Sequence, residues 1–190
     1  MGIPLITRAE YKTYAGIKST TQDAVIDSLI IKISELVKNL CRRTFLDYVD
    51  DPKVEYFDGG SSTILLLESP VRTISSVAYS SDYGQTYTDL VAFTDYVYIK
   101  STEAIAALNR SVFTYVPNGY KVTYTAGYEV LPEDLKLAIM DLVSYYIKND
   151  SAVHSNKAPG TNTVQIEYVT NTQLPAHIKR VLDLYTANYV

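Results

Sequence analysis

The side chains that could carry out nucleophilic or acid–base chemistry are few in this chain and widely spaced. There are two histidines, His154 in a polar stretch and His177 just after a Leu-Pro pair, and one cysteine, Cys41. Nucleophilic catalysis needs a nucleophile held against a base, and no Gly-x-Ser-x-Gly pattern marks one. We therefore expect no catalytic residues and no enzymatic activity. The alternative is an enzyme with an unrecognised site around His154 or His177, which substitution of both histidines would silence.

Carboxylates and glycines form no familiar binding motif either. A calcium loop needs acidic residues at alternate positions, a glycine and a closing glutamate, and the stretch from Asp47 to Gly60 does not keep that order. One cysteine and two histidines are too few for a cysteine-based zinc site. Gly59 and Gly60 lack both the GxGxxG frame and a phosphate-loop lysine. We expect no metal and no cofactor.

Length and charge narrow the function classes. The chain has 190 residues, of which 47% are hydrophobic, and this suits one globular domain. The formal net charge is −4, and residues 51–130 carry 5 basic and 9 acidic residues. A protein that grips nucleic acid has the opposite balance, so a DNA-binding packaging factor is disfavoured. The acidity is compatible with a surface past which DNA slides. No apolar run approaches the ~20 residues of a membrane span, so we expect no membrane contact.

Tyrosine is the unusual feature of the composition. There are 18 tyrosines against 4 phenylalanines and no tryptophan, and 11 of the tyrosines lie between Tyr48 and Tyr128. A tyrosine packs its ring while its hydroxyl stays wet, which suits half-solvated sheet faces and protein interfaces. Two interpretations stay open: a sheet with one solvated face, or rings that await a partner subunit.

Two helices are predicted at the start of the chain. Thr7 and Glu10 form a capping box for a short helix that continues to about Tyr14 and stops at Gly16. Thr20 is the expected N-cap of a second, long helix with the three-four apolar spacing of an amphipathic helix. Its apolar positions are Val25/Ile26, Leu29/Ile30, Ile33, Leu36/Val37 and Leu40/Cys41.

The middle of the chain, after Thr44, is rich in short strands. The segment KVEYFDGGSSTILLLESP reads as two strands around an Asp-Gly-Gly turn, and RTISSVAYS and YKVTYTA alternate in the same way. Residues 96–99 form another strand-like piece, whereas residues 101–111 fit a helical turn or a loop with a strand. We predict five or six strands in this part.

Helical signals return after Gly127. Pro132 suits the first position of a helix whose apolar face includes Leu135 and Ile139. Residues 150–163 read as a polar loop, VQIEYV as a short strand, and LPAHIKRVLDLYTANY as a last helix. The prediction is an α+β fold: a small helical core made of the long N-terminal helix, the helix after Pro132 and the C-terminal helix, with an inserted antiparallel β-rich unit.

The order of these pieces resembles the head–tail connector, or adaptor, proteins of tailed bacteriophages. The resemblance covers most of the chain from about Asp23 onward, whereas residues 96–111 and 150–163 match no part of that pattern. Four segments carry it: DAVIDSLIIKISELVKNLCRRTF, ESPVRTISSVAY, YKVTYTAGYEVLPEDLKLAIMDLVSYYIKN and LPAHIKRVLDLY.

The resemblance implies a structural virion protein of the neck, made in the host cytoplasm. Such proteins form a ring, often dodecameric, under the portal, extend the DNA channel and provide the platform for a stopper or tail protein. DNA passes through without sequence-specific binding. The expected organisation is a single adaptor domain over residues 1–190, with a helical core at 1–45 and 131–190 and a β-rich insertion at about 46–130.

Within this frame three sets of residues are candidates for specific roles. A structural corner between strand and helix is assigned to Gly127 and Pro132, since the glycine allows a tight turn and the proline restricts Leu131 to extended geometry. The C-terminal helix is expected to dock to the portal through Lys179, Tyr185 and Tyr189. The contacts between subunits are expected at Tyr79, Tyr83, Tyr124 and Tyr128.

A different class of function remains as the main alternative. A monomeric, tyrosine-rich β recognition module would bind a glycan or a cell-surface target along a groove lined by the tyrosines. It predicts a stable monomer with a saturable small ligand, whereas a connector predicts recovery with a portal protein.

Overall fold

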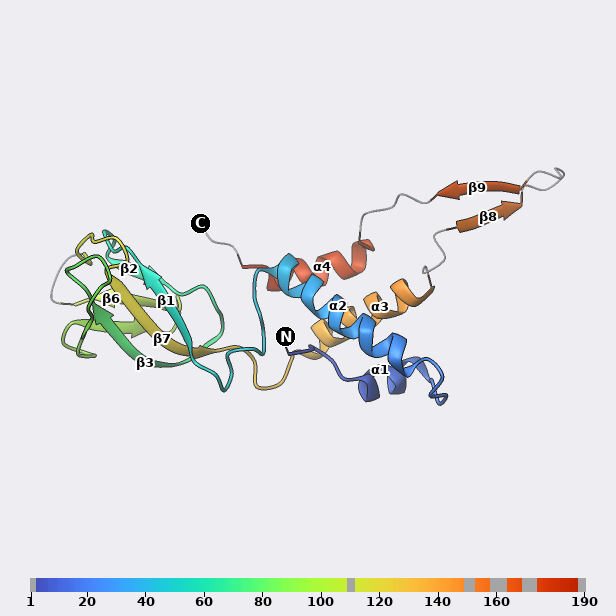
Figure 1. Ribbon diagram of the computed structural model, residues 1–190, viewed down its shortest axis with the longest axis horizontal. Helices are drawn as coiled ribbons and strands as arrows, with labels where there is room; N and C mark the ends of the chain where they lie inside the picture. The colour runs from blue at the N-terminus through green and yellow to red at the C-terminus, as the bar shows by residue number, and fades with distance from the viewer. Residues whose placement is uncertain (1–2, 109–111, 149–152, 158–163, 169–173, 188–190) are drawn as a thin grey trace. The chain divides into compact units, whose positions relative to one another are not determined.

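The computed structural model describes residues 3–108, 112–148, 153–157, 164–168 and 174–187. The chain divides into two compact units (Figure 1). The β unit comprises Met1–Ile3 and Arg43–Leu131, and the helical unit comprises Pro4–Arg42 and Pro132–Val190. The predicted α+β class is confirmed, because four helices occur together with antiparallel sheets among the described residues.

The β unit contains two antiparallel sheets. The first has four strands in the order β1-β7-β3-β4, and the second has three in the order β2-β6-β5. The strands are β1 (Lys53–Phe57), β2 (Thr63–Leu65), β3 (Val71–Tyr79), β4 (Thr88–Asp89), β5 (Tyr96–Ile99), β6 (Ala104–Ala107) and β7 (Tyr120–Ala126).

Strand pairing differs from what the sequence suggests. The two strands predicted around the Asp-Gly-Gly turn exist as β1 and β2, but they do not pair with each other. β1 pairs with β7 and β2 pairs with β6, so the turn carries the chain from one sheet to the other. Residues 101–111, which the sequence left open, contribute β6, and the described residues of the unit form seven strands rather than the five or six predicted.

A single hydrophobic core joins the two sheets. β7 alternates strictly, so that Tyr120, Val122, Tyr124 and Ala126 point inward. They meet inward residues of the other strands, and each fully buried large side chain contributes about 1.5–3 kcal/mol. The cluster comprises Ile64, Leu66, Val71, Val77, Tyr96, Ile105, Phe113, Tyr120, Val122, Tyr124 and Ala126.

The helical unit contains α1 (Arg8–Ala15), α2 (Asp23–Cys41), α3 (Glu133–Lys148) and α4 (Ala176–Tyr185), which pack on one another (Figure 1). The start of α1 is the predicted capping box. The Glu10 amide donates to the Thr7 hydroxyl, and the Thr7 amide donates to the Glu10 carboxylate at 2.7 Å. Gly16 ends α1 with φ 67°, as its position predicts.

The start of α2 was predicted wrongly. Gln22 occupies the N-cap position without a side-chain hydrogen bond, whereas Thr20 lies in the preceding turn, where its carbonyl accepts from Asp23. The buried face of α2 is also narrower than predicted. Val25 and Leu40 are exposed, and the buried apolar positions follow one stripe: Ile26, Ile30, Ile33, Val37 and Cys41.

Helices α3 and α4 begin in the same way. The Pro132 carbonyl accepts from the Lys136 amide at 2.9 Å, and the Pro175 carbonyl accepts from the Lys179 amide at 3.0 Å. Each proline therefore precedes the first helical residue and receives the first hydrogen bond of the helix. Pro132 lies one position earlier than predicted.

The stretch 150–163, predicted as a loop, contains a strand. β8 (Val153–Lys157) pairs antiparallel with β9 (Val164–Tyr168), and β9 is the predicted VQIEYV strand. The remaining residues of that stretch lie outside the described ranges. Among the described residues, no helix combines the length and the apolar character that crossing a bilayer requires.

Candidate interaction surfaces

The corner at the end of β7 depends on Gly127. Its φ is 111°, and a side chain there would overlap the Phe45 carbonyl and touch Val49. Its amide donates to the Pro70 carbonyl at 2.8 Å. Glycine adopts such a positive φ without the steric cost that a side chain would add. The role of Gly127 and Pro132 in setting the corner stays a prediction.

The two ends of the β unit are bonded to each other at this corner. The Tyr128 amide donates to the Phe45 carbonyl and the Ala126 amide to the Tyr48 carbonyl, at 2.8 and 2.9 Å. The rings of Phe45 and Tyr128 stack with their centroids 6.4 Å apart. Tyr128, a predicted inter-subunit residue, is half-buried and already packs against its own chain.

Tyr124, another predicted inter-subunit residue, belongs to the core of the β unit instead of an exposed contact surface. Its side chain is fully buried, and its hydroxyl accepts from the Glu68 amide at 3.0 Å. Burial raises the pKa of the Tyr124 phenol well above its usual value. A neighbouring subunit cannot reach this ring. The sequence held the signal, because Tyr124 is in phase with Val122 and Ala126 on an alternating strand.

A partly buried ion network holds the edge of the same sheet. The Lys53 ammonium lies 2.7 Å from a Glu55 oxygen and 3.3 Å from a Glu68 oxygen. Burial opposes the charged form, but the two carboxylates outweigh it and raise the pKa of Lys53. The Leu67 amide donates to Glu55 and the Thr44 amide to Glu68. These carboxylates therefore fix the backbone beside β1, a structural role.

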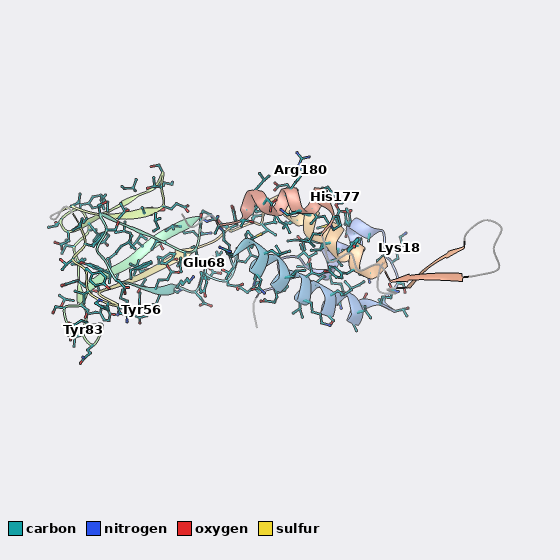
Figure 2. All side chains as sticks on the ribbon, turned by 90° about the horizontal axis from the view of Figure 1, so that it is seen from above. Lys18, Tyr56, Glu68, Tyr83, His177 and Arg180 are labelled. Carbon is teal, nitrogen blue, oxygen red and sulfur yellow. The ribbon has the colours of Figure 1, made fainter. Side chains whose placement is uncertain are left out.

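Tyr79 and Tyr83 have different surroundings. Tyr79 is half-buried, packs 5.2 Å from Tyr120, and lines a hollow of about 110 Å³ together with Leu90 and Phe113. Ligand pockets are usually about 300–1,000 Å³, so this hollow is smaller than a typical ligand pocket. Tyr83 is 70% exposed and has a positive φ of 61° (Figure 2). It is the predicted inter-subunit tyrosine that a neighbour can reach most easily.

The turn that presents Tyr83 is held by Asp82. The Asp82 carboxylate accepts from the hydroxyls of Ser80 and Thr86 and from the amides of Gln85 and Thr86. These bonds, led by that of Ser80, hold the pKa of Asp82 far below its usual value. Sequence reasoning treated this stretch only as a turn.

The outer face of the four-stranded sheet carries an aromatic strip that sequence reasoning did not single out. Tyr56 on β1 is 55% exposed, and its ring centroid lies 6.0 Å from that of Tyr87 (Figure 2). The Lys121 ammonium lies 5.0 Å from the Tyr87 ring centroid. Tyr56 and Lys121 are paired across the strands, so the sheet register brings these side chains together.

The residues predicted to dock to the portal are mostly engaged within the helical unit. Lys179 forms an ion pair with Asp183 at 2.7 Å, and the Tyr185 hydroxyl donates to Asp134 at 2.7 Å. Tyr189 lies outside the described residues. Another row on α4 is more exposed: His177 at 70% and Leu184 at 77%, with Arg180 between them (Figure 2). We call these three residues the outer row.

The spacing of the outer row could have been read from the sequence. Its members stand at i, i+3 and i+7 and alternate with the buried Ile178 and Leu182. The apolar stripe of an amphipathic helix is assigned to the core and its polar face to solvent, so a contact surface on the polar face is easily overlooked.

His177 lies on the exposed side of α4, near an aspartate of α3. The His177 Nε2 atom lies 3.8 Å from an Asp141 oxygen, whose other oxygen accepts the Tyr14 hydroxyl at 2.5 Å. That bond raises the pKa of Tyr14. The described part of the chain contains no group of three or more side chains able to hold a metal ion. The surroundings of His154 lie outside what the structure describes.

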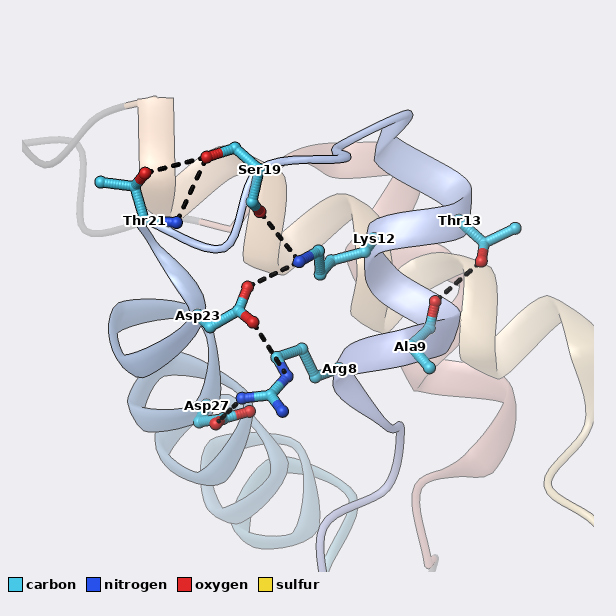
Figure 3. Close-up of polar contacts among 8 residues, drawn as sticks. All are labelled: Arg8, Ala9, Lys12, Thr13, Ser19, Thr21, Asp23 and Asp27. Atoms are coloured by element: carbon cyan, nitrogen blue, oxygen red, sulfur yellow. Dashed lines mark hydrogen bonds and ion pairs between the residues drawn. The ribbon is translucent and has the colours of Figure 1, made fainter.

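Charged side chains of α1 are neutralised by the start of α2 (Figure 3). Arg8 pairs with Asp27 at 2.6 Å and approaches Asp23 at 3.7 Å. Lys12 bonds Asp23 at 2.7 Å and the Ser19 carbonyl at 2.8 Å. These cations therefore join α1 to α2 through ion pairs, and their charge is balanced by aspartates rather than available to a phosphate backbone.

Comparison with known proteins places both units in one family. The Head completion protein family matches residues 4–187. The chain belongs to this family. The match spans the helical unit and the β unit alike, and it confirms the resemblance to head–tail connector proteins seen in the segment order. The family assignment thus rests on the whole chain rather than on one motif.

Individual relatives agree with the family. The head completion protein of Escherichia phage T5 is 26% identical over 189 residues, which cover 95% of this chain and 97% of the relative. A chain in the virion of the native gene transfer agent (GTA) particle has a TM-score of 0.63 and 14% identity, and the match covers 100% of this chain and 94% of that one.

Two neck structures share the fold as well. A chain in the neck of the empty GTA particle, computed with C6 symmetry, has a TM-score of 0.61 and 16% identity, with 98% and 91% covered. A chain in the neck of the native particle, computed with C12 symmetry, has a TM-score of 0.60 and 16% identity, with 96% and 88% covered. These likenesses establish a common fold.

Proposed function

We propose that this head completion protein is a structural component of the virion neck that forms a ring beneath the portal. The ring extends the DNA channel and gives a stopper or tail protein its attachment platform. The family match over residues 4–187 carries the proposal.

A closed ring of about twelve copies is the proposed assembly. Support comes from the fold shared with chains of GTA necks computed with C6 and C12 symmetry. A ring subunit needs two different surfaces, because each copy contacts one neighbour on each side. Tyr83 is the predicted contact tyrosine that remains open for such a role, whereas Tyr124 is in the core.

The proposed portal contact is α4. The sequence-based candidates Lys179, Tyr185 and Tyr189 lie on this helix or just after it, and the outer row adds exposed side chains of mixed character. Leu184 offers an apolar anchor and Arg180 a guanidinium that suits a carboxylate on the partner. Anchors of this type supply most of the binding energy in protein interfaces.

The proposed role toward DNA is passive. The net charge of −4 repels a polyanion, and the cations of α1 are already paired with aspartates. DNA would therefore pass through the ring without being held, as a conduit requires. Binding that falls steeply with added salt would be the sign of a DNA-gripping protein and would contradict this role.

The decisive experiment is recovery of partners during infection. The tagged chain is produced in cells infected by the phage that encodes it, and the bound proteins are identified by mass spectrometry. We expect a portal protein, with or without a stopper or tail protein, and we expect the chain in purified particles. The tag alone, expressed in the same cells, is the control. Recovery of neither partner, with the chain absent from particles, would overturn the proposal.

A further inference from the structure

Two apolar features lie on opposite edges of the three-stranded sheet. One is a loop before β5 that exposes Val91 and Phe93, which we call the knob. The other is the pair Leu65 and Leu67 at the end of β2, which we call the leucine pair. In the strand order β2-β6-β5, β2 and β5 are the two edge strands. Neither feature is explained by the core of the β unit.

The knob is a hydrogen-bonded turn. The Asp95 amide donates to the Val91 carbonyl, and the Val91 amide donates to the Asp95 carboxylate, both at 2.8 Å. The Phe93 amide donates to the Tyr96 carbonyl at 2.7 Å, and the Leu108 amide donates to the Asp95 carbonyl at 2.9 Å. The loop is thus closed on itself and attached to the strand that follows.

Phe93 stands at the tip of this turn in an unfavourable state. Its φ is 61°, a conformation that a phenylalanine rarely adopts, and its side chain is 83% exposed. Val91 beside it is 59% exposed. Phe93 thus departs from local preference twice, in the positive φ of its backbone and in the exposure of its apolar ring to water. Such departures concentrate at functional sites.

The leucine pair lies where the edge strand β2 ends. Ile64, Leu66 and Glu68 are buried, whereas Leu65 is 51% and Leu67 is 44% exposed. Leu65 is the last residue of β2, and Leu67 follows two positions later in the bend after the strand, so both exposed side chains lie at this end of β2. The backbone there is fixed, because the Leu67 amide donates to the buried Glu55 carboxylate at 3.2 Å.

The placement of the two features matches what a ring subunit needs. A head-to-tail contact joins two different surfaces, one on each side of the subunit, and repeats until the ring closes. The knob lies at the β5 edge and the leucine pair lies at the β2 edge of one sheet. A second copy of this chain supplies both halves in a one-to-one ratio, so that a closed ring leaves neither feature exposed.

We propose that the knob of each copy packs against the leucine pair of the next copy in the ring. The inference rests on the ring of the proposed function and names its contact surface in the β unit. Phe93 is the anchor and Val91 extends it, with Leu65 and Leu67 as the receiving surface.

The size of this contact indicates when it forms. An aromatic side chain buries about 150–250 Å², whereas a stable pair of proteins buries about 800 Å² on each partner. One phenylalanine and one valine fall well short of that area. The contact therefore forms where other contacts already hold the subunits in a ring, and free chains do not pair through it.

Thiol cross-linking in assembled particles tests the contact. The chain carrying both Phe93→Cys and Leu67→Cys is supplied during infection by a phage that lacks its own copy, and purified particles are treated with a short bis-maleimide. The native Cys41 is buried and does not interfere. We expect a ladder of covalently linked multimers of this chain on a denaturing gel. A second pair, Val91→Cys with Leu65→Cys, should give the same ladder.

Single-cysteine chains are the matched controls. Phe93→Cys alone and Leu67→Cys alone should remain single chains, because a head-to-tail contact brings neither residue against its own copy. Particles that contain the chain but give no ladder with either pair would overturn the contact. A dimer from Phe93→Cys alone, or a link to a different virion protein, would also overturn it. Absence of wild-type chain from the particles would instead contradict the proposed function.

Discussion

Gly127 holds a backbone conformation that a side chain would not tolerate. We expect Gly127→Ala to lower the free energy of unfolding by about 3 kcal/mol, because left-handed strain of ~1–2 kcal/mol adds to the overlap with the Phe45 carbonyl. Denaturant unfolding measures the difference. Gly16→Ala is the matched control, since Gly16 has φ 67° and open space around it. Gly16→Ala should lose only the free energy that corresponds to the backbone strain. Equal losses of unfolding free energy in the two variants would contradict the overlap at Gly127.

We expect Tyr124 and Lys53 to limit the stability of the β unit at alkaline pH. The pKa values of both groups are raised in the folded state, burial being the main cause for Tyr124 and the two glutamates for Lys53. The stability that they contribute is complete below the unfolded-state pKa of about 10 and decreases as the pH rises above it. We expect the melting temperature to fall above pH 10.

The variant Tyr124→Phe separates the two groups. It removes the phenol, so the fall above pH 10 should become shallower, and at pH 7 the loss of a buried hydrogen bond should cost about 1–3 kcal/mol. Melting curves between pH 7 and 11 provide the measurement. Tyr83→Phe, at an exposed tyrosine, should change neither value. An unchanged alkaline slope in Tyr124→Phe would show that this phenol does not couple to folding.

The alternation of buried residues along a strand predicts which tyrosines are buried. The residue type alone does not predict which tyrosines are exposed. Tyr124 repeats the period of Val122 and should have been assigned to the core. Tyr83 and Tyr56 are exposed because the Asp82 turn and the outer sheet face hold them there, and these depend on hydrogen bonds and on register. Phe93 was missed because nothing in the sequence around it signals a positive φ.

At the element scale, the capping box of α1 offers a direct test of a sequence-level signal. Thr7→Ala removes the hydroxyl that accepts the Glu10 amide, and we expect a loss of about 1 kcal/mol. Thermal unfolding measures it. Thr13→Ala is the control, since Thr13 lies on the same helix and its hydroxyl donates to the Ala9 carbonyl within the helix rather than capping its start. Equal effects of the two substitutions would argue against the capping role.

The same box should respond to acid. Burial disfavours the charged form of Glu10, but the Thr7 amide and hydroxyl and the Lys136 ammonium outweigh it and lower its pKa. A lowered folded-state pKa adds stability above the unfolded value of about 4.5, and this is lost as the pH falls below it. The variant Glu10→Gln should therefore show a weaker acid dependence than the wild type between pH 5 and 3.

The existence of helices and strands followed from the sequence, whereas their partners did not. Alternation in KVEYF and TILLL predicted two strands, but no local pattern reveals that their partners come from residues 120–126 and 104–107. The start of α2 was missed for a related reason. Its first turn is held by ion pairs from Arg8 and Lys12 of another helix, so no local cap was needed.

For the whole molecule, a substitution in the outer row of α4 should weaken assembly without lowering the stability of the folded chain. We expect Leu184→Asp to reduce recovery of the portal protein at least tenfold, because the substitution removes an exposed apolar anchor. The melting temperature should stay unchanged, since Leu184 is 77% exposed. Quantitative mass spectrometry of the tagged chain provides the measurement. Val25→Asp, at an exposed valine of α2, is the control and should retain the portal.

The α+β class and the insertion of strands between helices could be foreseen from periodicity. The surfaces that would contact other proteins could not, because exposure depends on how the strands pair. Lys179 and Tyr185 looked available in the sequence, yet each bonds an aspartate of its own unit. The spacing of the outer row is visible in the sequence of α4, whereas the knob depends on a turn and a strand pairing that no local pattern reveals.

The bonded ends of the β unit have a consequence for how such chains diversify. At the contact between Phe45 and Tyr128, the first and last residues of the strand-containing segment lie side by side. A segment whose two ends lie together can be exchanged for another with similarly joined ends. Homologous recombination at this junction would then replace the strands of the β unit and leave the helical unit unchanged.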